Sequence, residues 1–167
     1  MREGFAFSVL GSGFCVLLLI GKEYTLNYKR HNMAAWKQFE EIEAWQHART
    51  LCHSVFLVFE KETANKDYAL KNQMSRSSGS IMDNIAEGFE RNGNKEFIQF
   101  LSISKASCGE LKSQLYRCLD REYISENEFL KLKDETDAIR FKIGGLIRYL
   151  KNSALKGSKF KQSNTEH

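Results

Sequence analysis

The sequence of 167 residues contains no proline and only 11 glycines. Proline ends or kinks helices and glycine weakens them, so this shortage favours long uninterrupted helices over short strands separated by turns. A chain of this length suits one domain around one hydrophobic core. The composition therefore predicts an all-α protein.

A strong excess of one charge is also missing. The 25 Lys and Arg residues stand against 21 Asp and Glu residues, which gives a net charge of +4. Such a surface is mixed rather than polycationic. The charge alone does not identify a nucleic-acid partner.

The four cysteines form no CxxC pair and no zinc-finger spacing. They are Cys15, Cys52, Cys108 and Cys118. Three of them fall on apolar positions of predicted helices, and we interpret them as reduced core residues. This interpretation implies a reducing cytoplasm.

Motifs for catalysis are missing as well. The sequence contains neither GxSxG nor the phosphate-binding GxxxxGK[ST]. Glu87 and Glu110 could form a carboxylate pair, but a di-iron bundle also needs Glu-x-x-His motifs, and no histidine lies between His53 and His167. We expect a structural hydrogen bond for Glu87, to Arg76 or Ser107. The prediction is a protein without enzymatic activity, metal or cofactor.

Residues 4–21, GFAFSVLGSGFCVLLLIG, contain no charge. Three interpretations stay open: a signal peptide, a membrane anchor that holds the following domain on the cytoplasmic side, or an upstream start codon before a native start at Met33. Residues 1–32 are therefore treated as an extension, and the functional argument rests on residues 33–167.

Apolar residues recur at steps of three and four along four segments, which predicts helices over residues 37–61, 66–89, 94–121 and 126–152. The third and fourth segments keep a heptad repeat, which is typical of left-handed bundle packing. Short polar links between them predict an antiparallel up-down-up-down four-helix bundle over residues 33–152. Residues 153–167 are predicted to be a basic flexible tail.

Local patterns refine these helices. Ser75–Ser80, SRSSGS, predicts either a close helix contact or a kink. Asn92 or Asn94 is expected to cap the third helix, and Ser125 with Glu128 forms a capping box for the fourth. The first helix is apolar almost all round over residues 51–59, which indicates a surface for self-association.

Three ordered motifs resemble one family. They are FEEIEAWQHARTL at residues 39–51, NIAEGFERNGNKEFIQFLSISKASCGELKSQL at residues 84–115 and LDREYISENEF at residues 119–129. Together they resemble the small four-helix bundle proteins named for 23S rRNA intervening sequences, over about residues 36–152. One departure is Met82-Asp83, where that family often has a proline that kinks the helix.

The resemblance implies an up-down bundle that assembles as a homopentameric ring. Members are encoded within rRNA inserts or elsewhere in bacterial genomes. Similar bundles act as accessory proteins in diversity-generating retroelements, where a basic ring is thought to contact RNA. The family brings no catalytic residue with it.

A ring would repeat each basic side chain five times and strengthen the local field toward RNA phosphates. The predicted contacts are Lys105, Lys112, Arg117, Arg140, Arg148 and Lys151. The leading hypothesis is a cytoplasmic RNA-associated accessory factor. The alternatives are a protein-interaction scaffold that never meets RNA, and a membrane-tethered bundle.

Overall fold

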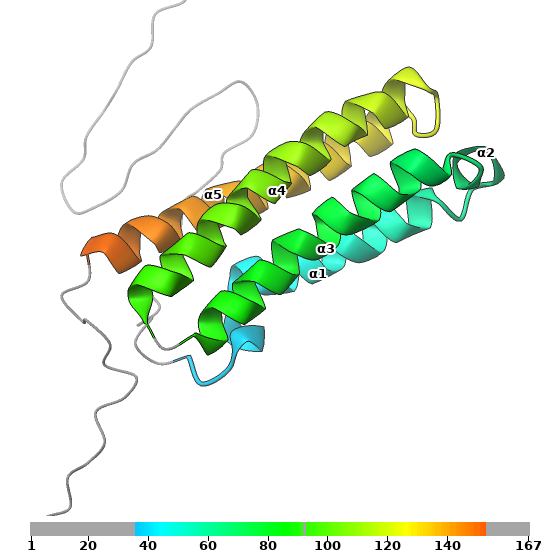
Figure 1. Cartoon of the computed structure of the whole chain (residues 1–167). Coiled ribbons are helices and arrows are strands. Elements are labelled where there is room, and N and C mark those ends of the chain that lie inside the picture. The colour runs from blue at the N-terminus through cyan, green and yellow to red at the C-terminus, as the bar shows by residue number, and fades with distance from the viewer. Residues whose placement is uncertain (1–35, 92, 153–167) are drawn as a thin grey trace, which may run out of the picture. The chain divides into compact units, whose positions relative to one another are not determined.

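The computed structural model of the chain describes residues 36–91 and 93–152, so the interpretations of residues 1–32 and of the tail lie outside it. The described regular structure is entirely helical (Figure 1), which confirms the predicted all-α class. Its elements are η2 (Phe39–Glu41), α1 (Glu43–Val58), α2 (Glu62–Asn65), α3 (Tyr68–Glu90), α4 (Asn94–Asp120) and α5 (Glu126–Asn152).

The four long helices lie side by side. Helix α4 packs on α3 and α5, and α1 packs on the same two helices from the other side (Figure 1). All four contribute fully buried side chains to one core: Leu51, Leu70, Met74, Ile81, Ile85, Leu101, Leu111, Leu115, Ile139 and Ile143. Burial stabilises each by roughly 1.5–3 kcal/mol. The heptad positions predicted for α4 and α5 are the ones that enter this core.

Polar contacts set the register between neighbouring helices. Ser77 Oγ of α3 lies 2.6 Å from Gln114 Oε1 of α4, and Ser80 Oγ lies 2.9 Å from Ser107 Oγ. Farther along, Ser104 Oγ donates to the carbonyl of Ile81 at 2.6 Å. As the residue number rises along α3, that of its partner on α4 falls.

The first predicted helix, residues 37–61, is shorter than expected. Ile42 is extended, with φ −76° and ψ 114°, and separates η2 from α1. Its side chain is buried, so the break places an apolar group in the core. The polar link predicted after the first helix contains α2, whose Ala64 is buried. Ile42 and Ala64 each enter the core, and their burial outweighs the preference of residues 37–61 for one continuous helix.

Side-chain caps begin α3 and α5, and of these two caps the sequence predicted the one on α5. Asp67 caps α3 by accepting the N–H of Leu70 at 3.1 Å. The predicted capping box of α5 is confirmed, because Ser125 N–H donates to Glu128 at 2.9 Å and Glu128 N–H donates to Ser125 Oγ at 3.3 Å. The predicted cap by Asn94 is wrong: Gly93 holds the N-cap position of α4 and Asn94 is the first helical residue. Residue 92 is not described.

The serine-rich segment at residues 75–80 does not interrupt α3, which runs without a break to Glu90. Ser77 and Ser78 are buried, and their hydroxyls donate to the carbonyl of Met74. Ser80 Oγ lies 2.9 Å from Ser107 Oγ, so α3 and α4 approach closely at this segment without a kink. A second close contact lies at Gly88, two residues before the end of α3. A Cβ at Gly88 would stand 2.6 Å from Cβ of Phe100 and 2.9 Å from Cδ2 of Phe97.

We expect Gly88→Ala to destabilise the fold although alanine favours helices. Overpacking against the backbone-near Cβ of Phe100 costs about 1–3 kcal/mol, more than the roughly 1 kcal/mol gained in helix propensity. The matched control is Gly109→Ala, because nothing lies within 4 Å of a Cβ there. Urea unfolding should show a lower midpoint for the first variant and an equal or higher one for the second. A more stable Gly88→Ala protein would contradict the close contact.

The capping box also predicts an acid dependence. Lys61 and the Ser125 groups lower the pKa of Glu128 from an ordinary 4.5 to about 2. A lowered folded-state pKa contributes stability above pH 4.5, and this contribution is lost as the pH falls from about 4.5 to about 2. Glu128→Gln should therefore flatten the pH dependence of the melting temperature in that window. The effect is modest because both partners are solvent-exposed. An unchanged slope would contradict the assignment.

Candidate nucleic-acid interface

The six predicted RNA contacts lie on two adjacent helices. Lys105, Lys112 and Arg117 belong to α4, and Arg140, Arg148 and Lys151 belong to α5. The six residues differ in their contacts. Some form contacts that hold the helices together, and others are exposed without an ion pair among the described residues.

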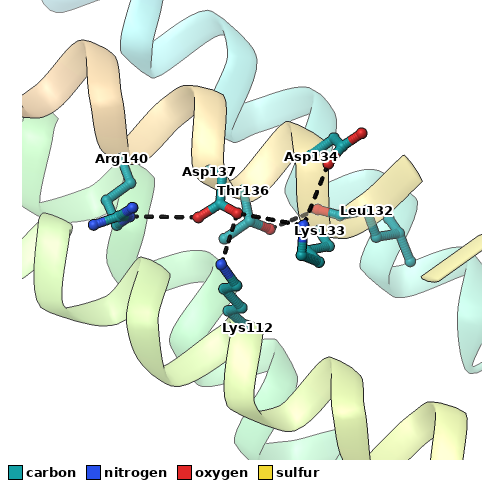
Figure 2. A network of polar contacts seen from close by, with 7 residues as sticks. All are labelled: Lys112, Leu132, Lys133, Asp134, Thr136, Asp137 and Arg140. Atoms are coloured by element: carbon teal, nitrogen blue, oxygen red, sulfur yellow. Dashed lines mark hydrogen bonds and ion pairs between the residues drawn. The ribbon is translucent and has the colours of Figure 1, made fainter. Parts of the chain in front are cut away.

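Lys112 is a link between α4 and α5. Its Nζ lies 2.7 Å from Oδ2 of Asp137, and both side chains are partly buried. Figure 2 shows Lys112 reaching Asp137 from the facing helix, with Arg140 and Lys133 arriving along α5. Arg140 Nε lies 3.4 Å from Asp137 Oδ1, and Lys133 Nζ lies 3.8 Å from Oδ2. Lys112 is thus chiefly a structural residue.

The charges in this cluster favour an ionised Asp137. Burial alone would raise the pKa of Asp137, but the hydrogen bond and charge of Lys112 outweigh it, with smaller contributions from Arg140 and Lys133, and the pKa is lowered. Lys133 also lies 3.5 Å from Asp134. Three cations face two carboxylates here, so one positive charge is left at the boundary between α4 and α5.

Arg117 points to a different neighbour. Its guanidinium donates to Oε1 of Gln73, on α3. One turn farther along α4, Arg121 forms an ion pair with Asp67, the capping residue of α3. Arg117 therefore takes part in the α3–α4 contact and does not join the basic residues that face α5.

Lys105 and Lys151 complete a group that we call the α4/α5 seam: Lys105, Lys112, Arg140 and Lys151. Lys105 precedes Lys112 by seven residues and Lys151 follows Arg140 by eleven, so each pair shares one side of its helix. Lys105 and Lys151 are exposed, and within residues 36–91 and 93–152 no ion pair joins either one. Gly144 lies between Arg140 and Lys151 on the same helix and leaves open space.

Arg148 lies on another side of α5. It is three residues before Lys151, which places it about 60° away around the helix. There it shares a face with two exposed apolar side chains, Leu130 and Phe141. It is also exposed and has no ion pair among the described residues. The six candidates therefore divide into the seam, one residue toward α3, and one residue on the outer face of α5.

The carboxylates considered for catalysis are surface residues. Glu87 pairs with Arg91 at 2.6 Å rather than with Arg76 or Ser107, and Glu110 accepts from Gln114 Nε2 at 3.1 Å. In the described part of the chain, no group of three His, Cys, Asp or Glu residues could hold a metal ion. None of the described helices is long and apolar enough to cross a membrane.

The thiols behave as core groups. Cys108 and Cys118 are buried, and burial raises the pKa of Cys108 to about 12 and that of Cys118 to about 11. Both are therefore protonated and poorly nucleophilic at neutral pH. Cys52 is half-buried. The core interpretation is confirmed for Cys108 and Cys118, while Cys15 is not described.

Sequence reasoning missed Asp137 and Lys133, which decide whether Lys112 and Arg140 are available to bind phosphate. The sequence does contain a signal for the pairing of Lys112 with Asp137. Asp137 follows the core residue Thr136 in the heptad of α5, and Lys112 follows the core residue Leu111 in that of α4. Charged residues that flank the core positions of neighbouring helices commonly pair across the interface.

Comparison with known proteins places these observations in context. The crystal structure of a protein of unknown function from the S23 ribosomal protein family, from Bacteroides thetaiotaomicron, matches with a TM-score of 0.59 and 19% identity. The match covers 63% of this chain and 98% of that one, and it shows a shared fold. No curated protein matches the chain. The family model of the 23S rRNA-intervening sequence protein matches residues 40–145, which is more than half of the sequence. The chain belongs to the 23S rRNA-intervening sequence protein family.

Proposed function

We propose that this protein is a non-enzymatic, RNA-associated accessory factor that contacts RNA phosphates through the α4/α5 seam. The observation that carries the proposal is the pair of exposed cations, Lys105 and Lys151, that have no acidic partner among the described residues. They extend the residual positive charge around Asp137 along the same boundary. Unpaired lysines are free to replace condensed counterions on a phosphate backbone.

The proposal includes an antiparallel up-down-up-down bundle that assembles as a homopentameric ring. The reversed order of partners along α3 and α4 supports the antiparallel arrangement. The ring follows from the family resemblance. One seam carries few charges, but five copies would present a repeated cationic surface with a much stronger field. Assembly would thereby give a nearly neutral chain appreciable RNA affinity.

The proposed compartment is the bacterial cytoplasm. Two described cysteines are buried thiols rather than disulfides, which is consistent with a reducing environment. The membrane-tethered alternative depends on residues 4–21, which are not described. Intact-mass measurement of the native protein would support that alternative if the chain begins at Met1 and would remove it if the chain begins at Met33.

A protein-interaction scaffold is the second candidate. It is favoured by two large apolar side chains near the end of α1, Phe56 and Leu57, which are 54% and 50% exposed. Contiguous exposed apolar surface is typical of protein interaction sites. A scaffold would bind its partner without a strong dependence on salt.

RNA binding should be measured across a salt series with structured RNA fragments and the full chain. If the seam contacts phosphates, log affinity falls linearly with log salt, with a slope set by the number of neutralised phosphates. The triple variant Lys105→Ala, Arg140→Ala, Lys151→Ala should flatten that slope by about 2–3. A matched triple variant removes three exposed cations elsewhere: Lys37, Arg49 and Lys131. It should change the slope much less, whereas equal effects would contradict a localised seam, and absent binding at low salt would favour the scaffold.

Lys112→Ala should behave differently from the seam lysines. It leaves the partly buried Asp137 without its closest cation, and a lost charge-assisted hydrogen bond costs on the order of 1–3 kcal/mol. We expect a lower free energy of unfolding in urea. Lys105→Ala, in which an exposed lysine without an ion pair is removed, should leave stability nearly unchanged. Equal stability of the two variants would show that the Lys112–Asp137 contact contributes little.

A further inference from the structure

The outer face of α5 carries an exposed aromatic ring between two opposite charges. Phe141 is 60% exposed, and Asp134 and Arg148 lie seven residues before and seven residues after it. Seven residues make nearly two full turns, so the three side chains lie within about 20° of Phe141 around the helix. Helices α1 and α4 pack on other sides of α5. The described part of the chain leaves this face uncovered.

Both charges on this face are open to a partner. The side chain of Asp134 is 61% exposed, and its ion pair at 3.5 Å is with the adjacent residue Lys133, so it joins α5 to no other helix. Arg148 is exposed and has no ion pair among the described residues. About 21 Å of helix separates Asp134 from Arg148. The two charges therefore cannot meet within one copy of α5.

Small residues surround Phe141. Ala138 precedes it by three residues, and Gly144 and Gly145 follow it, although glycine weakens a helix. At Gly88 a close contact inside the chain accounts for the missing side chain, whereas at Gly144 and Gly145 nothing lies within 4 Å of an added Cβ. Packing inside the chain therefore gives no reason for these two glycines.

The order of these residues is self-complementary. When two α5 helices lie antiparallel, with their Phe141 residues at the same position along the axis, Asp134 of each lies level with Arg148 of the other. Ala138 of each then lies level with Gly144 of the other, which leaves room beside the two aromatic rings. Asp134, Phe141 and Arg148 are spaced by heptads, the repeat that keeps two packed helices in contact over several turns.

We propose that the outer face of α5 binds a second copy of this chain through a two-fold contact between antiparallel α5 helices. At the centre Phe141 packs on the partner's Phe141 in the space left by the small residues, and aromatic pairs of this kind prefer an offset arrangement. At both ends Asp134 of one copy pairs with Arg148 of the other. The opposite charges fix the register of the contact.

A second copy is the occupant that the charge pattern favours. A two-fold contact places the same patch on both sides, so a patch fits it when its charges have opposite signs at equal distances from the centre. Asp134 and Arg148 meet this condition about Phe141. A phosphate backbone would be attracted by Arg148 but repelled by Asp134. One further copy, by contrast, satisfies both charges and covers the exposed ring.

The contact goes beyond the proposed RNA association and does not depend on the proposed ring. It is closed, because two copies use the outer face of α5 completely and leave none of it free for a third. If copies also form a ring through other faces, the two kinds of contact combine in dihedral symmetry and join two rings. The contact therefore doubles the number of chains in either case.

The two-fold contact also places the cations of the α4/α5 seam. Arg140 and Lys151 lie about 80–100° around α5 from Phe141, so the seam is about a quarter turn from the contact. The two-fold axis of an antiparallel pair is perpendicular both to the helices and to the line between them. Rotation about it leaves a direction along the axis unchanged. Both seams would therefore face the same side of the pair and double the cationic surface.

The first test is the mass of the full chain by light scattering after gel filtration, over a range of protein concentrations. The native mass should correspond to two chains, or to ten if the ring also forms. Phe141→Asp should halve that mass and retain the helical circular dichroism, because it places two carboxylates at the centre of the contact. The control Phe56→Asp changes a similarly exposed aromatic residue on α1 and should keep the native mass. An unchanged mass for Phe141→Asp would overturn the contact.

Charge reversal tests the register. Asp134→Arg and Arg148→Asp should each raise the dissociation constant of the pair about tenfold or more, because each places like charges together at both ends of the contact. The double variant Asp134→Arg, Arg148→Asp restores two opposite pairs within the same contact and should recover the native affinity. Additive weakening in the double variant would show that these residues do not meet.

A disulfide between identical positions tests the two-fold axis. Residues on the axis lie close to their own copies, so Phe141→Cys should form a covalent dimer on mild oxidation. The native chain and Phe56→Cys, treated in the same way, account for the cysteines already present and should not form it. Equal cross-linking of the three proteins would contradict an axis at Phe141.

The native mass separates this contact from the proposed ring. Two chains would support the contact and overturn the ring, and ten chains would support both. Five chains would support the ring and overturn the contact, and one chain would overturn both. RNA binding is decided in each case by the salt series.

Discussion

The register between α4 and its two neighbours is the constraint on which the rest of the structure depends. Apolar burial is not directional, so the shared core would tolerate small shifts of one helix along another. The buried contact of Ser77 with Gln114 fixes α3 against α4, and the contact of Lys112 with Asp137 fixes α5 against α4. A shift of one turn would leave partly buried polar groups without partners, which costs about 1–3 kcal/mol for each group. These two contacts therefore determine the position of each surface residue along the bundle axis.

Most of the fold could be predicted from the sequence because the core pattern is strong. The heptads of α4 and α5 have a single side that can be buried, and the capping box at Ser125 fixes where α5 begins. The first helix was harder to predict. Ile42 leaves the helical conformation so that its side chain can enter the core, and the local sequence gives no sign that the helix begins only after it. Similarly, Gly88 lies near the end of α3, and the sequence pattern does not show that its physical role is the close approach of Phe100.

The candidate site was less predictable than the fold for a related reason. A lysine on an amphipathic helix has the same sequence signal whether it faces an aspartate or solvent. Lys105 and Lys112 lie on one side of α4, yet one is exposed without an ion pair in the described structure and the other is held at 2.7 Å from Asp137. The difference comes from a residue 25 positions away in the chain. Counting the charges of one helix could not have separated a structural lysine from an available one.

The same distinction underlies the proposed RNA contact. A cation satisfied inside the chain stabilises one bundle, and a cation left over is available to phosphate. Lys112 and Lys105 represent these two cases on one helix. In water a single exposed lysine binds a phosphate weakly, because both charges are well solvated. The proposed ring would change this balance by placing equivalent lysines at fixed distances, so that several counterions would leave the RNA in one binding event. The chain would then need no catalytic geometry, since the order of its charges along α4 and α5 would specify where RNA lies.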